Sequence, residues 1–247
     1  MEARSVEEIP TGDGWQYEPK WDGFRCLAFR NGDEISLQSK SGQPLARYFP
    51  DVAANVAKLR QREFVLDGEL VIPISGALSF DELQLRLHPA ASRVQKLAAA
   101  HPAIYIVFDV LAENGKSYLK LNLRERRRLL EKFARSNLRS AKSIRLSPAT
   151  TDYDVAKNWF GKTGRDLDGI IAKRLDAAYA SGERTAAVKV KKNPNSRFRR
   201  GWLSLCSWRP RHRFPVTRTL RRRWTAPSRR IYLWFQNIGT ARLNEKI

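Results

Sequence analysis

The stretch EPKWDGFR, from Glu18 to Arg25, holds one lysine between a proline and a tryptophan. A lysine becomes a nucleophile only when it loses its proton, and desolvation or nearby positive charge favours that loss. Glu18, Trp21 and Phe24 would give Lys20 an apolar wall with a polar edge. The same residues also suit an Asp-Gly turn flanked by solvated charges, so this stretch alone leaves both interpretations open.

Four later stretches place charged or aromatic side chains in or beside segments that should be buried strands. They are Asp67-Gly68-Glu69-Leu70, Phe108-Asp109-Val110-Leu111, Asp168-Gly169-Ile170-Ile171-Ala172-Lys173 and Val188-Lys189-Val190-Lys191. Buried charges are costly unless they are paired or bound to a ligand. Because Lys189 and Lys191 alternate with valines, we expect both on one face of a strand. Two cations there, with carboxylates on other strands, could hold a phosphate and a metal ion together.

Single members of this set also have plain structural interpretations. Phe108 would suit a hydrophobic core, where phenylalanine is usually found. Asp67-Gly68 would suit a two-residue hairpin turn, and Lys173 would suit a solvated strand end. The ordered set, rather than any one member, favours a functional site.

The elements that must carry these residues follow from periodicity and capping signals. Strands are predicted from Phe64, Ile104, Asp168 and Ala186, with a hairpin over residues 24–39 around Asn31-Gly32. Four helices are predicted. One begins at Pro50, a second follows a capping box formed by Ser79 and Glu82, a third covers residues 124–137, and a fourth runs from a cap at Thr151 to about Gly161. Arg126, Arg127 and Arg128 are expected to form a solvated helix face. Strands outnumber helices without strict alternation, so the fold class is α+β with largely antiparallel sheets.

The composition indicates a polyanionic partner. The 247 residues carry a formal net charge of +21, with 42% hydrophobic residues to form a packed core. Such a charge favours nucleic acid over an anionic membrane. The two cysteines form neither a disulfide framework nor a zinc pattern, which indicates a reducing cytosol. We expect neither a signal peptide nor a membrane span, because no suitable apolar run occurs.

The positive charge is concentrated toward the C-terminal end. Residues 196–247 contain 13 Arg and 1 Lys against the single acid Glu245, which leaves +8 for residues 1–195. Tryptophans and prolines fall there without a helical or strand rhythm. We therefore place a domain boundary between residues 195 and 196.

The five ordered motifs resemble those of the covalent nucleotidyltransferase superfamily, most closely the bacterial ATP-dependent DNA ligases associated with end joining. Those families carry Lys-x-Asp-Gly-x-Arg, Asp-Gly-Glu, Phe-Asp-x-Leu, Glu/Asp-Gly-x-x-x-Lys and Lys-x-Lys, in this order and at similar spacing. LQSKSGQPLARYFPD, LRERRRLLE and AKRLDAAYASGER fit as well. The resemblance covers about Gly14 to Lys192. It implies a nucleotidyltransferase (ATP-grasp-like) domain of antiparallel sheets flanked by helices.

The resemblance implies a role for each matching residue at the nucleotide. Lys20 would attack the α-phosphate of ATP and form lysyl-AMP, releasing pyrophosphate. Phe108 would stack on adenine, Glu18 lies where the base is recognised, and Lys173 would also contact the nucleotide. Arg25 would contact the nucleotide and later the 5′-phosphate of a nick.

Further matches surround the phosphates. Lys40 stands where the family usually has arginine, and a lysine there loses the bidentate phosphate fork. Glu69 would bind the ribose hydroxyl or assist the metal, and Asp168 would help to bind the metal. Lys189 and Lys191 would neutralise the α-phosphate. The implied cofactors are ATP and Mg²⁺ or Mn²⁺.

The resemblance also implies partners and a place in the cell. Nicked or broken double-stranded DNA would be the substrate, and a DNA-end-binding repair protein would be a partner. The protein would act as a monomer in the bacterial cytoplasm, associated with the nucleoid.

The C-terminal end departs from this family. Such ligases continue into an oligonucleotide-binding barrel with alternating strands and glycine-rich turns. Only 56 residues follow Lys191, and they lack that pattern. Residues 196–247 are therefore interpreted as a truncated or frameshifted barrel remnant, or as a divergent basic tail that binds nucleic acid.

The leading interpretation is an ATP-dependent DNA ligase that seals 5′-phosphate/3′-hydroxyl nicks, with ligation impaired by its atypical C-terminus. An RNA ligase or a capping-type nucleotidyltransferase would share the lysine chemistry. A catalytically dead DNA-binding remnant would bind DNA in a salt-sensitive way and form no covalent adduct.

Overall fold

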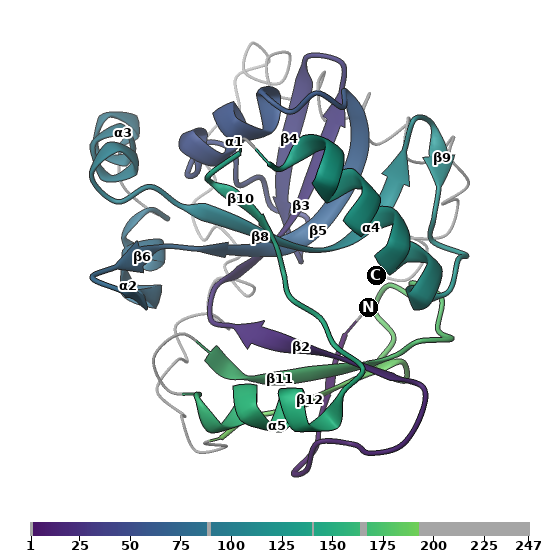
Figure 1. The fold of residues 1–247 in the computed structure, drawn as a ribbon. Coiled ribbons are helices and arrows are strands. Elements are labelled where there is room, and N and C mark those ends of the chain that lie inside the picture. Colours follow the sequence, from purple (N-terminus) through teal and green to yellow (C-terminus); the bar gives the residue numbers. More distant parts are fainter. Residues whose placement is uncertain (1, 88–89, 140, 164–166, 193–247) are drawn as a thin grey trace, which may run out of the picture. The chain divides into compact units, whose positions relative to one another are not determined.

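The fold is seen in a computed structural model that describes residues 2–87, 90–139, 141–163 and 167–192 (Figure 1). Strands β3 (Phe24–Asn31), β4 (Glu34–Ser39), β5 (Glu63–Val71), β8 (Ile104–Glu113), β9 (Lys116–Ser117) and β10 (Ile144–Leu146) form the larger sheet. Its order is β10-β8-β5-β3-β4, with β9 paired to β8. Every pair is antiparallel except β10 with β8.

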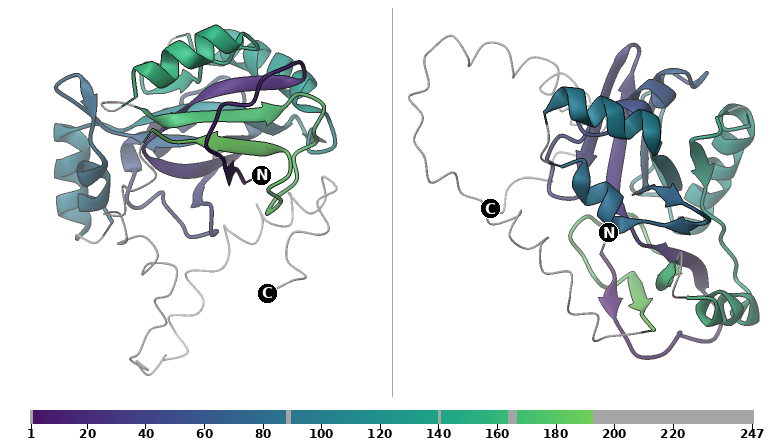
Figure 2. Two further views of the ribbon diagram at one scale, coloured as in Figure 1. Left: turned by 90° about the horizontal axis from the view of Figure 1, so that it is seen from below. Right: turned by 90° about the vertical axis from the view of Figure 1, so that its left-hand side faces the viewer.

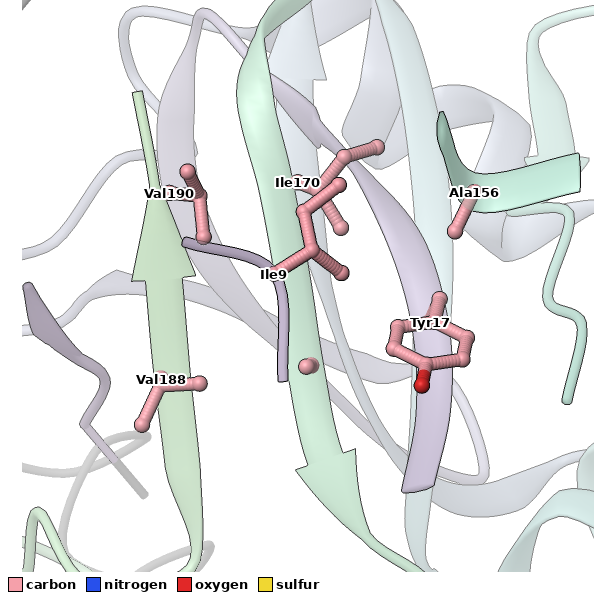
Figure 3. Close-up of a cluster of buried hydrophobic side chains, with 7 residues drawn as sticks. Ile9, Tyr17, Ala156, Ile170, Val188 and Val190 are labelled. Carbon is pink, nitrogen blue, oxygen red and sulfur yellow. The ribbon is translucent and has the colours of Figure 1, made fainter. Parts of the chain in front are cut away.

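The smaller sheet has the order β1-β12-β11-β2. Its strands are β1 (Arg4–Ser5), β2 (Trp15–Trp21), β11 (Leu167–Arg174) and β12 (Ala187–Val190). Only β1 and β12 run parallel. Helix α5 (Tyr153–Gly161) lies along this sheet, as Figures 1 and 2 show. A buried cluster joins them: Ile9, Tyr17, Ala156, Ile170, Ala172, Val188 and Val190 (Figure 3).

The remaining helices pack around the larger sheet. They are α1 (Pro50–Ala57), α2 (Phe80–Leu85), α3 (Ala91–Ala100) and α4 (Leu123–Asn137), and the short strands β6 (Pro73–Ile74) and β7 (Ala77–Leu78) lead into α2. Helix α4 packs on β8 and β10. Its Phe133 ring meets Phe64 of β5 edge to face, with ring centroids 5.2 Å apart. None of the helices in the described ranges is long and apolar enough to cross a bilayer.

The structure confirms the α+β fold with largely antiparallel sheets. Gly32, at a φ of +62°, closes the predicted hairpin between β3 and β4, and the side chain of Ser79 accepts a hydrogen bond at the start of α2. The prediction of Thr151 as a helix cap is wrong, because the Asp152 side chain accepts from Asp154 and Val155 at the start of α5. Asp67 lies within β5, so the alternative of a hairpin turn there is also wrong.

Seven elements of the described ranges were not predicted, and five of them are the short strands β1, β6, β7, β9 and β10. Strand β2 carries Lys20, and its proline and charged residues do not form a regular apolar alternation. Helix α3 begins without a side-chain cap. The predicted boundary between residues 195 and 196 and the basic tail that follows it lie outside the described residues.

Candidate active site

Lys20 faces a carboxylate that arrives from the neighbouring strand. β2 pairs with β11, and the pairing shifts register between Leu167 and Gly169. Gly169 has a φ of +149°, and a Cβ there would come within 1.9 Å of the Val190 carbonyl oxygen. Only glycine fits at that point. Next to this irregularity, Asp168 Oδ2 lies 2.6 Å from Lys20 Nζ and 2.8 Å from Lys191 Nζ.

The charges around Lys20 act on one another. Burial alone would raise the pKa of Asp168, but Lys20 and Lys191 together hold it below its usual range. The pKa of Lys189 is lowered, first by burial and then by the positive charge of Lys20 and Lys191. β12 ends at Val190, so Lys191 is the first residue after the strand. The cluster therefore holds three lysines around one ionised carboxylate.

Arg25 is fixed by a second carboxylate. Its Nε donates to Asp67 Oδ1 at 3.0 Å and its Nη2 to Asp67 Oδ2 at 2.6 Å. Tyr179 adds a third member, because its hydroxyl donates to Asp67 Oδ2 at 2.8 Å and accepts from Arg25 Nη2 at 3.1 Å. Burial alone would raise the pKa of Asp67, yet Arg25 and Tyr179 hold it low. The guanidinium is thus held rigidly at the pocket wall.

Glu18 and Lys173 form a buried ion pair on adjacent strands. Lys173 Nζ lies 2.7 Å from Glu18 Oε2, and Gln16 Nε2 donates to Glu18 Oε1 at 2.7 Å. Lys173 Nζ also lies 4.6 Å from the ring centre of Phe108. Lys173 is 8% exposed, so the alternative of a solvated strand end is wrong. Phe108 is only partly buried and lines the pocket, so it does not belong to the core.

Glu69 behaves differently from Asp67, its neighbour on the same face of β5. Burial raises the pKa of Glu69 to about 8, and the charges of Lys20 and Arg25 offset only part of that effect. A carboxyl group with such a pKa is largely protonated near neutral pH. A cation that approached it would favour loss of that proton.

The prediction of a solvated helix face is wrong for Arg126. It is fully buried and donates from Nε to Asp109 Oδ1 at 3.0 Å and from Nη2 to Asp109 Oδ2 at 3.1 Å. Its Nη1 donates to the backbone carbonyls of Leu121 and Ala177. The arginine thus ties α4 to the strand that carries Phe108. Of the three arginines, only Arg128 is fully exposed, as predicted.

Lys40 reaches the pocket rim through the N-terminal segment. Its Nζ lies 2.7 Å from Glu2 Oε1, and Arg184 Nε donates to Glu2 Oε2 at 3.0 Å. Lys40, first, and Arg184 lower the pKa of Glu2 to about 2. Glu2 is therefore paired with Lys40 and Arg184, two cationic side chains that could otherwise bind a phosphate.

One pocket brings most of the predicted residues together. The pocket has a volume of about 150 Å³ and opens to solvent. Of the predicted residues, Glu18, Lys20, Arg25, Glu69, Phe108 and Lys173 line it. Asp168 joins through its contact with Lys20, and Lys191 joins through its contact with Asp168, while Lys40 and Lys189 lie at the margin of the pocket.

Sequence reasoning missed Asp67, Tyr179 and Glu2 as members of this pocket. Asp67 was visible in the Asp-Gly-Glu motif, but only Glu69 received a role. Tyr179 lies in the matched stretch AKRLDAAYASGER, where a lone aromatic among small and polar residues was the available signal. Nothing in the local sequence marks Glu2.

The carboxylates around Lys20 could supply part of the ligand set of a divalent metal ion. Within the described residues, no group of three His, Cys, Asp or Glu side chains could bind a metal by itself. Asp168 contacts Lys20 directly, and the positive charge of Lys20 acts on Glu69 by lowering the pKa of its carboxyl group. Mg²⁺ commonly takes one or two protein carboxylates and completes its shell with phosphate oxygens and water, which agrees with such a pair.

Known proteins share most of the described chain. The family model for the ATP-dependent DNA ligase domain matches residues 2–191. The chain is 46% identical over 193 residues to DNA ligase C2 of Mycolicibacterium smegmatis, covering 77% of this chain and 52% of that protein. It is 41% identical over 186 residues to DNA ligase C of Mycobacterium tuberculosis, covering 74% and 51%. It thus spans about half the length of these curated relatives.

A solved structure agrees with the fold. Mycobacterial DNA ligase D complexed with ATP and MES aligns with a TM-score of 0.57 at 25% identity, over 77% of this chain and 60% of that one. The sequence motifs, the pocket and these comparisons therefore converge on one family.

Proposed function

Because the chain belongs to the family of ATP-dependent DNA ligase domains, we propose that it is a DNA ligase that seals 5′-phosphate/3′-hydroxyl nicks through lysyl-AMP. One observation carries the proposal. The Lys20 amine lines the pocket 2.6 Å from Asp168, with two further lysines close by. An amine among cations, beside a carboxylate, is suited to attack on a phosphate.

The first step forms a bond between Lys20 Nζ and the α-phosphorus of ATP. The bond from that phosphorus to the bridging oxygen breaks, and pyrophosphate leaves. Lys20 must first give up a proton. Asp168 Oδ2 accepts a hydrogen bond from the Lys20 amine and so orients it in the pocket. Lys189 and Lys191 add positive charge that balances the negative charge on the phosphate.

We assign Glu69 and Asp168 as the residues that would hold Mg²⁺ or Mn²⁺. When bound, the ion would supply charge neutralisation at the phosphates. The raised pKa of Glu69 supports this assignment, because a nearby cation favours the ionised form of a carboxyl group that burial otherwise keeps neutral.

The opposite end of the pocket suits the nucleoside. Phe108 offers an aromatic surface for adenine. Glu18 and Lys173 neutralise each other beside it and leave a polar edge for base recognition. Arg25, held by Asp67 and Tyr179, would contact the nucleotide and then the 5′-phosphate of the nick. Lys40 would bind phosphate once it releases Glu2.

Two further steps complete ligation. AMP moves from Lys20 to the DNA 5′-phosphate, and the 3′-hydroxyl then attacks that phosphate and displaces AMP. The partner is therefore nicked or broken double-stranded DNA, with a DNA-end-binding repair protein for broken ends. We place the protein, as a monomer, at the nucleoid in the bacterial cytoplasm.

We further propose that residues 1–195 form the adenylation domain and that residues 196–247 are a basic remnant of a barrel domain. Translation of the gene in its other two reading frames tests the second part. A frameshifted barrel would reappear there as a glycine-rich sequence with strand alternation. Its absence from both frames would contradict the frameshift.

The central test is transfer of label from α-labelled ATP in the presence of Mg²⁺, followed by denaturation. We expect a labelled band in the wild-type chain and in Lys157→Ala, which changes an exposed lysine of α5. Lys20→Ala should lose the band. Persistence of the label in Lys20→Ala would overturn the assignment of Lys20.

Two companion assays separate the alternatives. Label from α-labelled GTP instead of ATP would favour a capping-type enzyme, and sealing of nicked RNA instead of DNA would favour an RNA ligase. Binding of DNA without any adduct would identify a catalytically dead remnant.

A further inference from the structure

Helix α4 carries a row of cations on its solvent face. Arg124, Arg128, Lys132 and Arg135 are exposed on the helix, and Arg139 is exposed just after its end. Their spacing is four, four, three and four residues. At 100° per residue these positions fall within a stripe about 80° wide. We call these five residues the α4 stripe.

Apart from Arg135, whose charge in the last turn of α4 favours the helix dipole, the α4 stripe has no evident structural task. Within the described ranges, none of its five side chains forms an ion pair or a hydrogen bond to another residue. Other arginines of the same helix do have such tasks, since Arg126 pairs with Asp109 and Arg127 with Glu131. Like charges three or four residues apart repel and destabilise a helix. An external polyanion would relieve that repulsion.

The first turn of α4 lies close to residues of the pocket. The Arg124 backbone N–H donates to the Leu175 carbonyl at 3.1 Å, and the Arg126 guanidinium lies 5.7 Å from the Tyr179 ring centre. Tyr179 in turn contacts Arg25 in the pocket. From that end the helix runs about 22 Å, at 1.5 Å per residue over its 15 residues. Figure 1 shows α4 at the surface of the larger sheet.

We propose that the α4 stripe binds the phosphate backbone of the duplex DNA that flanks the break, outside the catalytic pocket. The identity of the duplex rests on the proposed function. A rigid row of four arginines and one lysine matches a polymer with evenly repeated negative charge, and guanidinium groups bind phosphate oxygens in pairs. Such contacts position the duplex without reading its sequence.

The test compares two triple variants of the full chain that change net charge equally. Arg128→Glu/Lys132→Glu/Arg135→Glu reverses the centre of the α4 stripe. Arg93→Glu/Lys96→Glu/Lys157→Glu reverses exposed cations on α3 and α5. Affinity for a nicked duplex is measured over a salt series, and lysyl-AMP formation is measured in parallel. Both triples keep residues 196–247, so that segment contributes equally.

We expect the α4 triple to lose at least tenfold in affinity at about 0.1 M salt. Its slope of log affinity against log salt should fall by about 2–3, because each lost phosphate contact removes about 0.9. The control triple should lose less than about threefold, and both should form lysyl-AMP like the wild type.

Three outcomes would overturn the inference. Equal losses in the two triples would show an effect of net charge alone. Unchanged DNA affinity in the α4 triple would show that the α4 stripe does not contact the duplex. Loss of binding to phosphatidylglycerol vesicles, with DNA affinity unchanged, would assign the stripe to a membrane surface. Absence of lysyl-AMP in the wild type would instead contradict the proposed function and leave the comparison of DNA affinities readable.

Discussion

Asp67 and Glu69 stand two residues apart on β5, and their carboxyl groups differ in protonation. Asp67 is bonded to Arg25 and Tyr179, which hold its pKa low despite burial. Burial dominates at Glu69 and raises its pKa to about 8. Neighbouring carboxyl groups whose pKa values are shifted in opposite directions commonly mark an active site. The ionised one anchors an arginine, and the neutral one is available to a cation.

Glu69 should make stability depend on pH. Its pKa is raised from 4.5 in the unfolded chain to about 8 in the fold, so the folded state binds the extra proton between these values. This contribution to stability is fully present below pH 4.5 and is lost as pH rises through about 8. Glu69→Gln cannot titrate and should flatten the dependence. Urea unfolding at a series of pH values measures it, with exposed Glu7→Gln as the control. An unchanged pH profile in Glu69→Gln would contradict the raised pKa.

Pairing between elements decides which side chains surround Lys20. β2 brings Lys20, and β11 brings Asp168 only because Gly169 lets the chain pass close to β12. α4 supports the same pocket from behind the larger sheet, where Arg126 neutralises the buried Asp109. The ion pair therefore links one helix to the strand that carries Phe108.

Removal of the Arg126 side chain should be strongly destabilising. Arg126→Ala leaves Asp109 as a buried charge without its partner, and such losses cost about 3–5 kcal/mol in free energy of unfolding. Arg128→Ala removes an exposed arginine of the same helix and should change stability by less than about 0.5 kcal/mol. Denaturant titration of both variants measures the difference. Similar values for the two would mean that the buried pair contributes little.

At the scale of the whole molecule, chemistry and charge are separated along the chain. All site residues lie within residues 2–191, the range of the family match. Residues 196–247 carry +13 of the total charge of +21. Charge of that density binds DNA backbones without regard to sequence. Adenylation and general DNA affinity should therefore be separable.

Deletion of residues 196–247 should leave lysyl-AMP formation intact. The same deletion should weaken DNA binding and make its salt dependence shallower, because fewer counterions are released. Label transfer from ATP and binding titrations at several salt concentrations measure the two effects. A shortened protein that is folded, as judged by circular dichroism, but forms no adduct would contradict the separation.

Local sequence signals were enough to predict much of the local structure and to nominate the candidate reactive side chains. The turn at Gly32, the start of α2 at Ser79 and the helix over residues 124–137 each depend on neighbours a few positions away. Five motifs in order were enough to select Lys20 and to indicate the fold. Periodicity and capping are local signals, so they carried this information.

Contacts between residues that are distant in sequence depend on the tertiary structure. Lys20 pairs with Asp168 across 148 positions, and Tyr179 reaches Asp67 across 112. Arg126 looked like part of a solvated face because its burial depends on Asp109, which lies on another element. Periodicity shows which face of an element is apolar but does not show which partner covers it. The ion pairs that tune this pocket form only between chain segments brought together by folding.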